Sequence, residues 1–260
     1  MKTAQITAQY IDHMGSDLSV VNAARTSFGK ESWWADVEKM VLKDGDAGLI
    51  RYLATGYRTK EWDEFLDEIM GWALRYDRDA AKVLLTNALH AYKRRAQHWA
   101  PFAHPHMQIR MKLPIFLARQ FVKHQVGGVW SEESRRYMSS EPEFWFPEEW
   151  HTRPDDIKQG SDGLIEYQDE ARGYAEDVVS LALEKYILLQ DLKVAPEEAR
   201  IVLPLNTMTT VTWTGSLLFW SRVCNQRVDS HAQKAAQELG KKISDIARPL
   251  FPASWAALVG

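Results

Sequence analysis

The sequence contains little cysteine and no long apolar run. Cys224 is its only cysteine, so an internal disulfide is excluded, and this usage is typical of the reducing cytoplasm. No apolar stretch approaches the roughly 18 residues that a helix needs to span a bilayer. The N-terminal residues, which include Asp12 and Asp17, do not resemble a secretory signal. We therefore expect a cytoplasmic protein with no membrane partner.

An excess of positive charge is also missing. The formal net charge is −3, which gives no general attraction to nucleic acid, so any binding of phosphate must be local. The chain is instead rich in apolar residues: 45% of its residues are hydrophobic and 11 are tryptophans. Because its 260 residues include no linker-like segment, we predict a single domain over residues 1–260.

The pattern of apolar residues predicts both strands and helices. We expect strands at residues 3–11, 106–113 and 209–214. Helical spacing indicates a mostly helical region at residues 32–95. A second long amphipathic helix is predicted from the spacing of Leu164, Tyr167, Ala171, Tyr174, Val178 and Leu181. The mixture indicates an α/β fold class.

Residues that start or stop helices mark further boundaries. We predict a helix capped by Asp17 and running through Arg25, a helix opened by Pro114 with Arg119 and Lys123 on one face, and a last helix capped by Asp229 or Ser230 and ended by Pro249.

The stretch from Arg119 to Tyr137 combines side chains that a hydrophobic core does not use. It holds several cations together with histidine, glutamate and serine, and it contains the pair Gly127-Gly128. Unpaired charge is costly to bury, whereas arginine suits bidentate contacts with phosphate, and adjacent glycines let the backbone approach a ligand closely. We interpret this stretch as a binding site for a phosphate-bearing ligand.

The same stretch resembles a motif of the flavin-dependent thymidylate synthases. That motif runs Arg-His-Arg, a short gap, Ser, then Asn-Glu-x-Ser-x-Arg-Tyr, and the matching residues here are His124, Glu132, Ser134, Arg136 and Tyr137. Residues 17–28, 98–104, 199–206 and 225–233 resemble four other blocks of the family, in the family's order. Blocks in this order are far more specific than one short motif.

The resemblance implies a fold and a reaction. The fold is a mixed, mainly antiparallel sheet packed with helices, in a homotetramer whose active sites lie at subunit interfaces. The reaction is reductive methylation of dUMP to dTMP, in which methylenetetrahydrofolate supplies the carbon, NADPH is the reductant, and FAD supplies the hydride. The region 32–95 is longer than the family pattern requires, so we interpret it as an inserted helical elaboration.

The resemblance also implies which residues form the site. Arg227 matches the arginine that favours the deprotonated, enolate-like pyrimidine, so it is the expected catalytic residue and a substrate ligand. The other expected nucleotide ligands are Arg119, Gln120, Lys123 and Arg200, with Glu132, Ser134 and Arg136 from a neighbouring chain. The expected flavin ligands are His98, Lys123, His124, Gln125, Ser131, Glu132, Ser216, Arg222 and His231.

Several of these positions depart from the family pattern. Lys123 and Gln125 stand where the motif has arginines, and Ser131 stands where it has asparagine. Two alanines, Ala100 and Ala103, replace threonine and glutamate, and Leu218 stands where arginine is common. The nucleotide half of the site therefore matches the family better than the flavin half.

Arg200 and Arg227, which lie outside the stretch from Arg119 to Tyr137, also have simpler interpretations. Arg227 could form a salt bridge with Asp229, and Arg200 could pair with Glu197 at i,i+3 spacing. Neither pair would bind a ligand.

Other reactive residues have structural explanations as well. The segment His104-Pro105-His106 lacks the spacing of a zinc site, and we expect no metal. Cys224 lies in an expected helix interior and is predicted to be buried and inert, so the chemistry needs no protein thiol. Ser134 has no accompanying general base, which favours binding over nucleophilic attack.

Two other functions stay open. The same fold could act on another pyrimidine nucleotide, as a dCMP-directed or hydroxymethylating enzyme. A non-enzymatic nucleotide-binding module that uses residues 119–136 is the more distant alternative, because the chain has no wider basic stripe.

Overall fold

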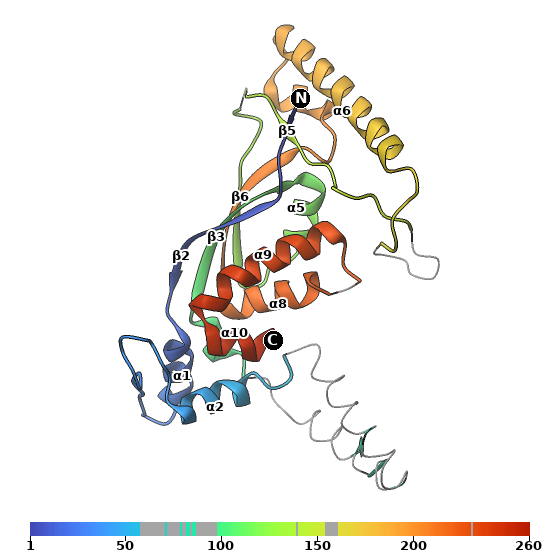
Figure 1. Cartoon of the computed structure of the whole chain (residues 1–260). Helices are drawn as coiled ribbons and strands as arrows, with labels where there is room; N and C mark the ends of the chain where they lie inside the picture. The colour runs from blue at the N-terminus through green and yellow to red at the C-terminus, as the bar shows by residue number, and fades with distance from the viewer. Residues whose placement is uncertain are drawn as a thin grey trace. The chain divides into compact units, whose positions relative to one another are not determined.

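The computed structural model (Figure 1) describes residues 1–57, 98–138, 140–153, 161–229 and 231–260, together with Gly71, Asp79, Lys82, Val83, Leu85 and Thr86. Most of residues 58–95, which belong to the predicted helical region 32–95, and Ser230 as a predicted cap lie outside the described residues. The chain divides into two compact units. Unit 1 comprises Met1–His13, Met107–Gly215 and Arg222–Ile246, and unit 2 comprises Met14–His106, Ser216–Ser221 and Ala247–Gly260.

The main sheet has four strands in the order β2-β3-β6-β4 (Figure 1). They are β2 (Thr7–Met14), β3 (His106–Pro114), β4 (Gly128–Glu132) and β6 (Met208–Ser216). Strand β4 runs antiparallel to β6, with Trp130 opposite Trp213. The alternation predicted for β3 is confirmed, because Met107, Ile109 and Met111 are fully buried while the residues between them are not.

A small second sheet and the long helix α6 (Gln168–Asp191) also belong to unit 1. Strands β1 (Lys2–Thr3) and β5 (Glu143–Phe144) pair in parallel. Phe144 of β5 and Phe146, two residues later, pack against Val179, Leu183 and Tyr186 of α6. The predicted helix is present, but it begins at Gln168, so Leu164 and Tyr167 lie before it. Tyr174, Val178 and Leu181, predicted to form its apolar stripe, are exposed. A different face of α6 is buried.

Four further helical segments complete unit 1. They are α5 (Ile115–Phe121), α7 (Pro196–Ala199), the 3-10 turn η2 (Arg200–Val202) and most of α9 (Lys234–Leu250), and α8 (Leu217–Arg227) contributes its C-terminal residues. Helix α5 begins directly after Pro114, as predicted, because the fixed φ of proline suits a helix start and its missing N–H is not needed there. With sheet and helices together, the predicted α/β class is confirmed.

The elements of unit 2 in its described part are mainly helices. Helix α1 (Asp17–Thr26) contacts α2 (Asp44–Leu53), the 3-10 helix η1 (Ala100–Ala103) and α10 (Pro252–Leu258). The carboxylate of Asp17 is buried and accepts hydrogen bonds from the backbone N–H groups of Ala253 (2.7 Å) and Ser254 (2.9 Å), so it caps α10. Its predicted role as the cap of its own helix is wrong, because Ser16 forms the capping box of α1.

Two other boundary predictions are wrong for local reasons. Residues 32–43 are not helical: Asp36 and Val41 form an isolated antiparallel bridge, and the helix begins only at Asp44. The last long helix begins only at Lys234, and Asp229 does not cap it, because the Asp229 carboxylate accepts from the backbone N–H of His231 in the preceding turn. The helix ends at Leu250, one residue after the predicted stop at Pro249. No helix in the described part of the chain is long and apolar enough to cross a membrane.

Candidate functional site

Arg227 lies at the C-terminal end of α8, and neutral groups hold its side chain. Its Nε donates to Nε2 of His124 (3.0 Å), and its Nη2 donates to the backbone carbonyl of Gln120 (3.0 Å). The guanidinium carbon lies 5.5 Å from the ring centre of Phe121. The alternative of a salt bridge with Asp229 is wrong: among the described residues no carboxylate pairs with Arg227, and Asp229 pairs with His231.

His124 is the neutral partner in this cluster. Burial, and then the positive charge of Arg227, lower the pKa of His124 to about 4. The imidazole is therefore uncharged at neutral pH, and Nε2 is its acceptor atom, which leaves the proton on Nδ1. Burial also lowers the pKa of Arg227, but a guanidinium does not lose its proton in a protein. The cluster thus holds one positive charge that no carboxylate of the described residues neutralises.

Helix α5 brings the backbone of Gln120 to this cluster, and the Gln120 side chain reaches α9. Its Nε2 donates to Oε1 of Gln233 (2.7 Å), just before the first residue of α9. Arg119 and Lys123 are both exposed. Their predicted position on one helical face is wrong, because α5 ends at Phe121 and Lys123 lies beyond it.

The segment after β4 is the second part of the predicted site. Glu132 accepts from the Thr209 hydroxyl (3.0 Å) and from the Trp130 indole N–H (3.2 Å), so both of its oxygens have fixed partners. Arg136 donates from Nε to the Ser134 hydroxyl (3.1 Å). Glu132 and Arg136 are exposed nevertheless.

Arg200 stands apart from these contacts. Its Nε donates to the backbone carbonyl of Glu197 (3.2 Å), within its own turn, and its side chain is exposed. The alternative of a pair with the Glu197 carboxylate is therefore wrong, because the contact is with the Glu197 backbone carbonyl.

The predicted flavin ligands fall into two groups. In unit 1, the side chains of Gln125, Ser131, Arg222 and His231 are exposed. The two in unit 2 have other contacts: the His98 ring lies 5.6 Å from that of Tyr52, and the buried Ser216 hydroxyl accepts from the backbone N–H of Phe219 at the start of α8. Ser216 therefore acts as a helix cap.

The donor chemistry of unit 1 fits a phosphate-bearing cofactor. Arg119, Lys123 and Arg222 are exposed cations, and none has an ion pair among the described residues. Cations that are not neutralised by the protein can contact a diphosphate, and arginine can do so with two parallel hydrogen bonds. On charge, FAD fits these side chains.

Cys224 takes no part in the site. Its side chain is fully buried, its Sγ lies 3.6 Å from the carbonyl oxygen of Gly240, and burial raises the pKa of the thiol. The prediction of a buried, inert thiol is confirmed. In the part of the chain that the structure describes, no three His, Cys, Asp or Glu side chains are grouped as metal ligands.

Sequence reasoning missed two contacts that define the cluster. Phe121 lies beneath the Arg227 guanidinium, and Gln233 fixes the side chain of Gln120. Gln233 does belong to a block that resembles the family, whereas Phe121 reads only as one more apolar residue of α5. In the sequence, the position of Phe121 next to Gln120 was the only sign that it belongs to the site.

Comparisons with known proteins agree with the resemblance. A family described as Thymidylate synthase complementing protein (Thy1) matches residues 9–253. The flavin-dependent thymidylate synthase of Thermosipho africanus is 27% identical over 253 residues, which cover 96% of this chain and 89% of that protein. The enzyme of the same name from Kosmotoga olearia is 31% identical over 165 residues, which cover 62% of this chain and 71% of that protein.

A solved structure shares the fold. A UMP/dUMP methylase, PolB from Streptomyces cacaoi bound with 5-Br dUMP, aligns with a TM-score of 0.72 at 23% identity, covering 99% of this chain and 96% of that one. The fold alone would leave the function open. The family match over residues 9–253, together with these relatives, shows that the chain belongs to the flavin-dependent thymidylate synthases, enzymes that transfer a one-carbon unit and use FAD, NAD(P)H and methylenetetrahydrofolate.

Proposed function

We propose that this protein catalyses the reductive methylation of dUMP to dTMP, with methylenetetrahydrofolate as carbon donor and NADPH as reductant of FAD. The observation that supports this best is the Arg227 guanidinium, held half-buried by the neutral His124 ring and the Gln120 carbonyl. Its charge is fixed in place, and no carboxylate in the described part of the chain pairs with it.

Such a cation suits the chemistry of C5 of a pyrimidine. Carbon–carbon bond formation at C5 needs electron density there, and that density rises as negative charge develops on the uracil N3 and O4 atoms. A preorganised cation beside those atoms stabilises the charge without reorganising in the transition state. We assign this role to Arg227.

The remaining nucleotide contacts follow the exposed polar residues. We assign Arg119, Gln120, Lys123 and Arg200 to dUMP, together with Glu132, Ser134 and Arg136 of a neighbouring chain. In support, the hydroxyl of Thr209 and the indole of Trp130 orient the Glu132 carboxylate, and Ser134 orients Arg136. Both side chains are thus prepared for a ligand that their own chain does not supply.

For the flavin we assign Lys123, His124, Gln125, Ser131, Glu132, Arg222 and His231 of unit 1, and His98 and Ser216 of unit 2. When bound, FAD supplies hydride to the pyrimidine-linked carbon. The part of this chain is to bind and orient: Lys123 and Arg222 offer charge to the diphosphate, and Nδ1–H of His124 offers a hydrogen bond. The Ser216 hydroxyl, already used as a cap, is the weakest of these assignments.

We further propose a homotetramer, and an exposed stripe on α6 supports it. Tyr174, Val178 and Leu181 are 65%, 61% and 56% exposed, and Leu188 and the C-cap residue Leu192 continue the stripe. A run of large apolar side chains at helical spacing is typical of a subunit interface. Val178→Glu combined with Leu181→Glu should lower the molar mass measured by light scattering, whereas Glu184→Gln on the same helix should not.

The nearest alternative keeps the fold and changes the pyrimidine. Lys123 and Gln125 stand where arginines are usual, and the aligned PolB structure is described as a methylase of both UMP and dUMP. Incubation with methylenetetrahydrofolate, NADPH and either dUMP, UMP or dCMP, followed by mass spectrometry of the nucleotide, distinguishes the cases. Conversion of dUMP to dTMP supports the proposal. A hydroxymethylated product, or conversion of dCMP or UMP alone, contradicts it.

A further inference from the structure

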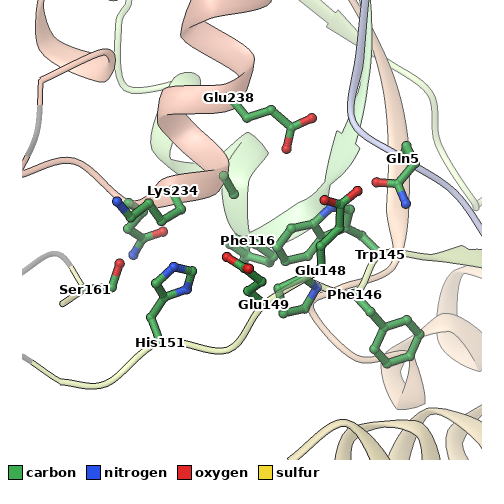
Figure 2. Close-up of a pocket in the computed structure, with 13 residues that line it drawn as sticks. Gln5, Phe116, Trp145, Phe146, Glu148, Glu149, His151, Ser161, Lys234 and Glu238 are labelled. Carbon is green, nitrogen blue, oxygen red and sulfur yellow. The ribbon is translucent and has the colours of Figure 1, made fainter. Parts of the chain in front are cut away.

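Unit 1 contains a cavity of about 700 Å³ that is lined by none of the residues assigned above to nucleotide or flavin. Its size lies within the range of cavities that bind small molecules, roughly 300–1,000 Å³. The lining comes mainly from the segment after β5, from Phe116 of α5 and from the start of α9 (Figure 2). The cavity is therefore a candidate site for a ligand other than the nucleotide and the flavin.

Two aromatic rings form the apolar part of the lining. Phe116 and Trp145 lie with ring centres 5.6 Å apart, at 56° to each other, and both side chains are half-buried. The next residue, Phe146, is buried in the cluster that packs against α6. Because the π electrons make the face of an aromatic ring negative, such rings attract a cation that lies over them.

The chain between Trp145 and Trp150 is anchored at both ends by amide groups. The Trp145 N–H donates to the Asn206 carbonyl (2.9 Å), and its carbonyl accepts from the Asn206 side chain (2.9 Å). At the other end, the Gln168 side chain accepts from the Trp150 N–H (2.7 Å) and donates to the Trp150 carbonyl (2.7 Å). Residues 146–149, which include two glutamates, lie between these anchors. Their backbone is thus held in place before a ligand binds, which lowers the cost of binding.

The charged part of the lining is mainly negative. Three glutamates, Glu148, Glu149 and Glu238, line the cavity, against one lysine, Lys234. Glu148 and Glu149 have no ion pair or side-chain hydrogen bond within the described residues. Glu238 pairs with Lys242 through Oε1, at 3.4 Å. Figure 2 shows the three carboxylates around the two aromatic rings, so negative charge and ring faces meet in one cavity.

This combination suits an organic cation better than a metal ion. Among the described residues, no three His, Cys, Asp or Glu side chains are grouped as metal ligands, so the three carboxylates do not converge on one point. A guanidinium spreads its charge over a plane and offers five N–H donors along the edges of that plane. It also stacks on aromatic faces, which a compact, strongly hydrated ammonium does less well.

We propose that this cavity binds a small organic cation that carries a guanidinium group, namely free arginine or the amine formed by its decarboxylation. The plane of the guanidinium lies on the face of Trp145 or Phe116. Its N–H groups donate to the carboxylates of Glu148 and Glu238. Lys234, which lies toward another side of the cavity in Figure 2, contacts the carboxylate of the ligand where the ligand has one. The site does not depend on the proposed reaction, because dUMP and FAD are anions and bind elsewhere.

Calorimetric titration of the whole chain with FAD bound tests the proposal, with arginine, agmatine (the decarboxylated amine), citrulline and lysine as the probes. At about 0.15 M salt, long-range attraction between charges is largely screened. We expect arginine or agmatine to bind with Kd below about 1 mM. Citrulline has an uncharged urea group in place of the guanidinium, and lysine has an ammonium, so each should bind roughly 10-fold more weakly or worse than arginine.

Two variants locate the binding in this cavity. Glu148→Gln combined with Glu238→Gln should weaken the binding of the guanidinium ligand by roughly 10-fold or more, since two charged acceptors are lost. Glu166→Gln, which changes an exposed glutamate outside the cavity, is the matched control and should have no effect. Circular dichroism shows whether each variant is folded, and the comparison of arginine with citrulline needs no variant.

The outcomes separate the two ligands and test the site. Tighter binding of arginine assigns the amino acid, and tighter binding of agmatine assigns the amine. The proposal is overturned if neither binds below about 1 mM, or if citrulline or lysine binds as tightly as arginine. Binding that a folded double glutamine variant leaves unchanged overturns it as well. If arginine binds through these glutamates but the protein makes no dTMP, the proposed reaction fails and this site stands.

Discussion

The Arg227 cluster and the segment from Ser131 to Tyr137 differ in how much of their surroundings one chain provides. Arg227 is half-buried and already bonded to His124 and Gln120. Arg136 and Tyr137 are exposed, Tyr137 to 80%, and Arg136 bonds only to its neighbour Ser134 among the described residues. The described contacts of Arg227 all lie within one chain, whereas the side chains of Arg136 and Tyr137 face solvent. In the proposed function, the first part activates the substrate and the second binds a substrate held by another subunit.

The largest expected effect is at Arg227. Arg227→Ala should lower kcat for dTMP formation by roughly 100-fold or more, the scale of losing one preorganised donor to a developing oxyanion. Arg227→Lys should recover little, because a point charge does not reproduce the planar contacts to His124 and Gln120. Oxidation of NADPH without nucleotide should persist in both variants. A normal kcat with a raised KM would instead show that Arg227 binds the substrate and the transition state equally well.

A smaller loss is expected at Arg136, and it tests whether the two parts meet across an interface. Arg136→Ala should lower kcat/KM by roughly 10-fold or more, because a charged hydrogen bond to the nucleotide is lost. When Arg136→Ala and Arg227→Ala proteins are mixed and exchange subunits, some sites should regain both arginines, and activity should rise above that of either variant alone. No rise despite exchange shown by native mass spectrometry would place both arginines of a site in one subunit.

The same comparison shows what a sequence can and cannot predict. Strand β3 follows from alternation, strand β6 from its threonine, valine and tryptophan residues, and helix α5 from Pro114, because these signals are local. The buried face of α6 does not follow, since apolar residues occur on two of its faces and only the tertiary packing of Phe144 and Phe146 decides which face is covered. Likewise Arg227 was found through its block, but its neutral partner His124 required the fold, because 103 residues separate the two.

The pH dependence of stability tests whether His124 is neutral in the Arg227 cluster. The pKa of His124 is lowered in the folded protein to about 4, below its usual value of 6.5. The folded state therefore prefers the neutral ring, and this contribution is present above pH 6.5 and is lost as the pH falls through about 4. Urea unfolding should show a loss of about 1 kcal/mol over that range, allowing for solvent screening of a partly exposed group.

The matched control for this experiment is His124→Gln, which keeps an acceptor for Arg227 but does not titrate. Its stability should lack the His124 component of the slope between pH 6.5 and pH 4. Equal slopes in the two proteins would show that the protonation of His124 is not opposed by the fold.

The smallest effect is expected at Cys224. Because its thiol is buried and its pKa is raised, Cys224→Ala should keep most of the activity per folded molecule. Stability should fall by about 1 kcal/mol, the order of a small truncation in a packed core. A variant that is folded by near-ultraviolet circular dichroism but completely inactive would show that the thiol takes part in the reaction.

The buried carboxylate of Asp17 has a consequence for the order in which the chain can fold during synthesis. Its hydrogen-bond donors are the backbone groups of Ala253 and Ser254, which lie 236 and 237 residues further along the chain. While the ribosome still encloses these two residues, α1 has no partner for this carboxylate and must leave it in water, because a buried carboxylate without donors is costly. Unit 2 therefore cannot close around α1 before Ala253 and Ser254 have left the ribosome. Until then a growing chain would leave Asp17 exposed to water.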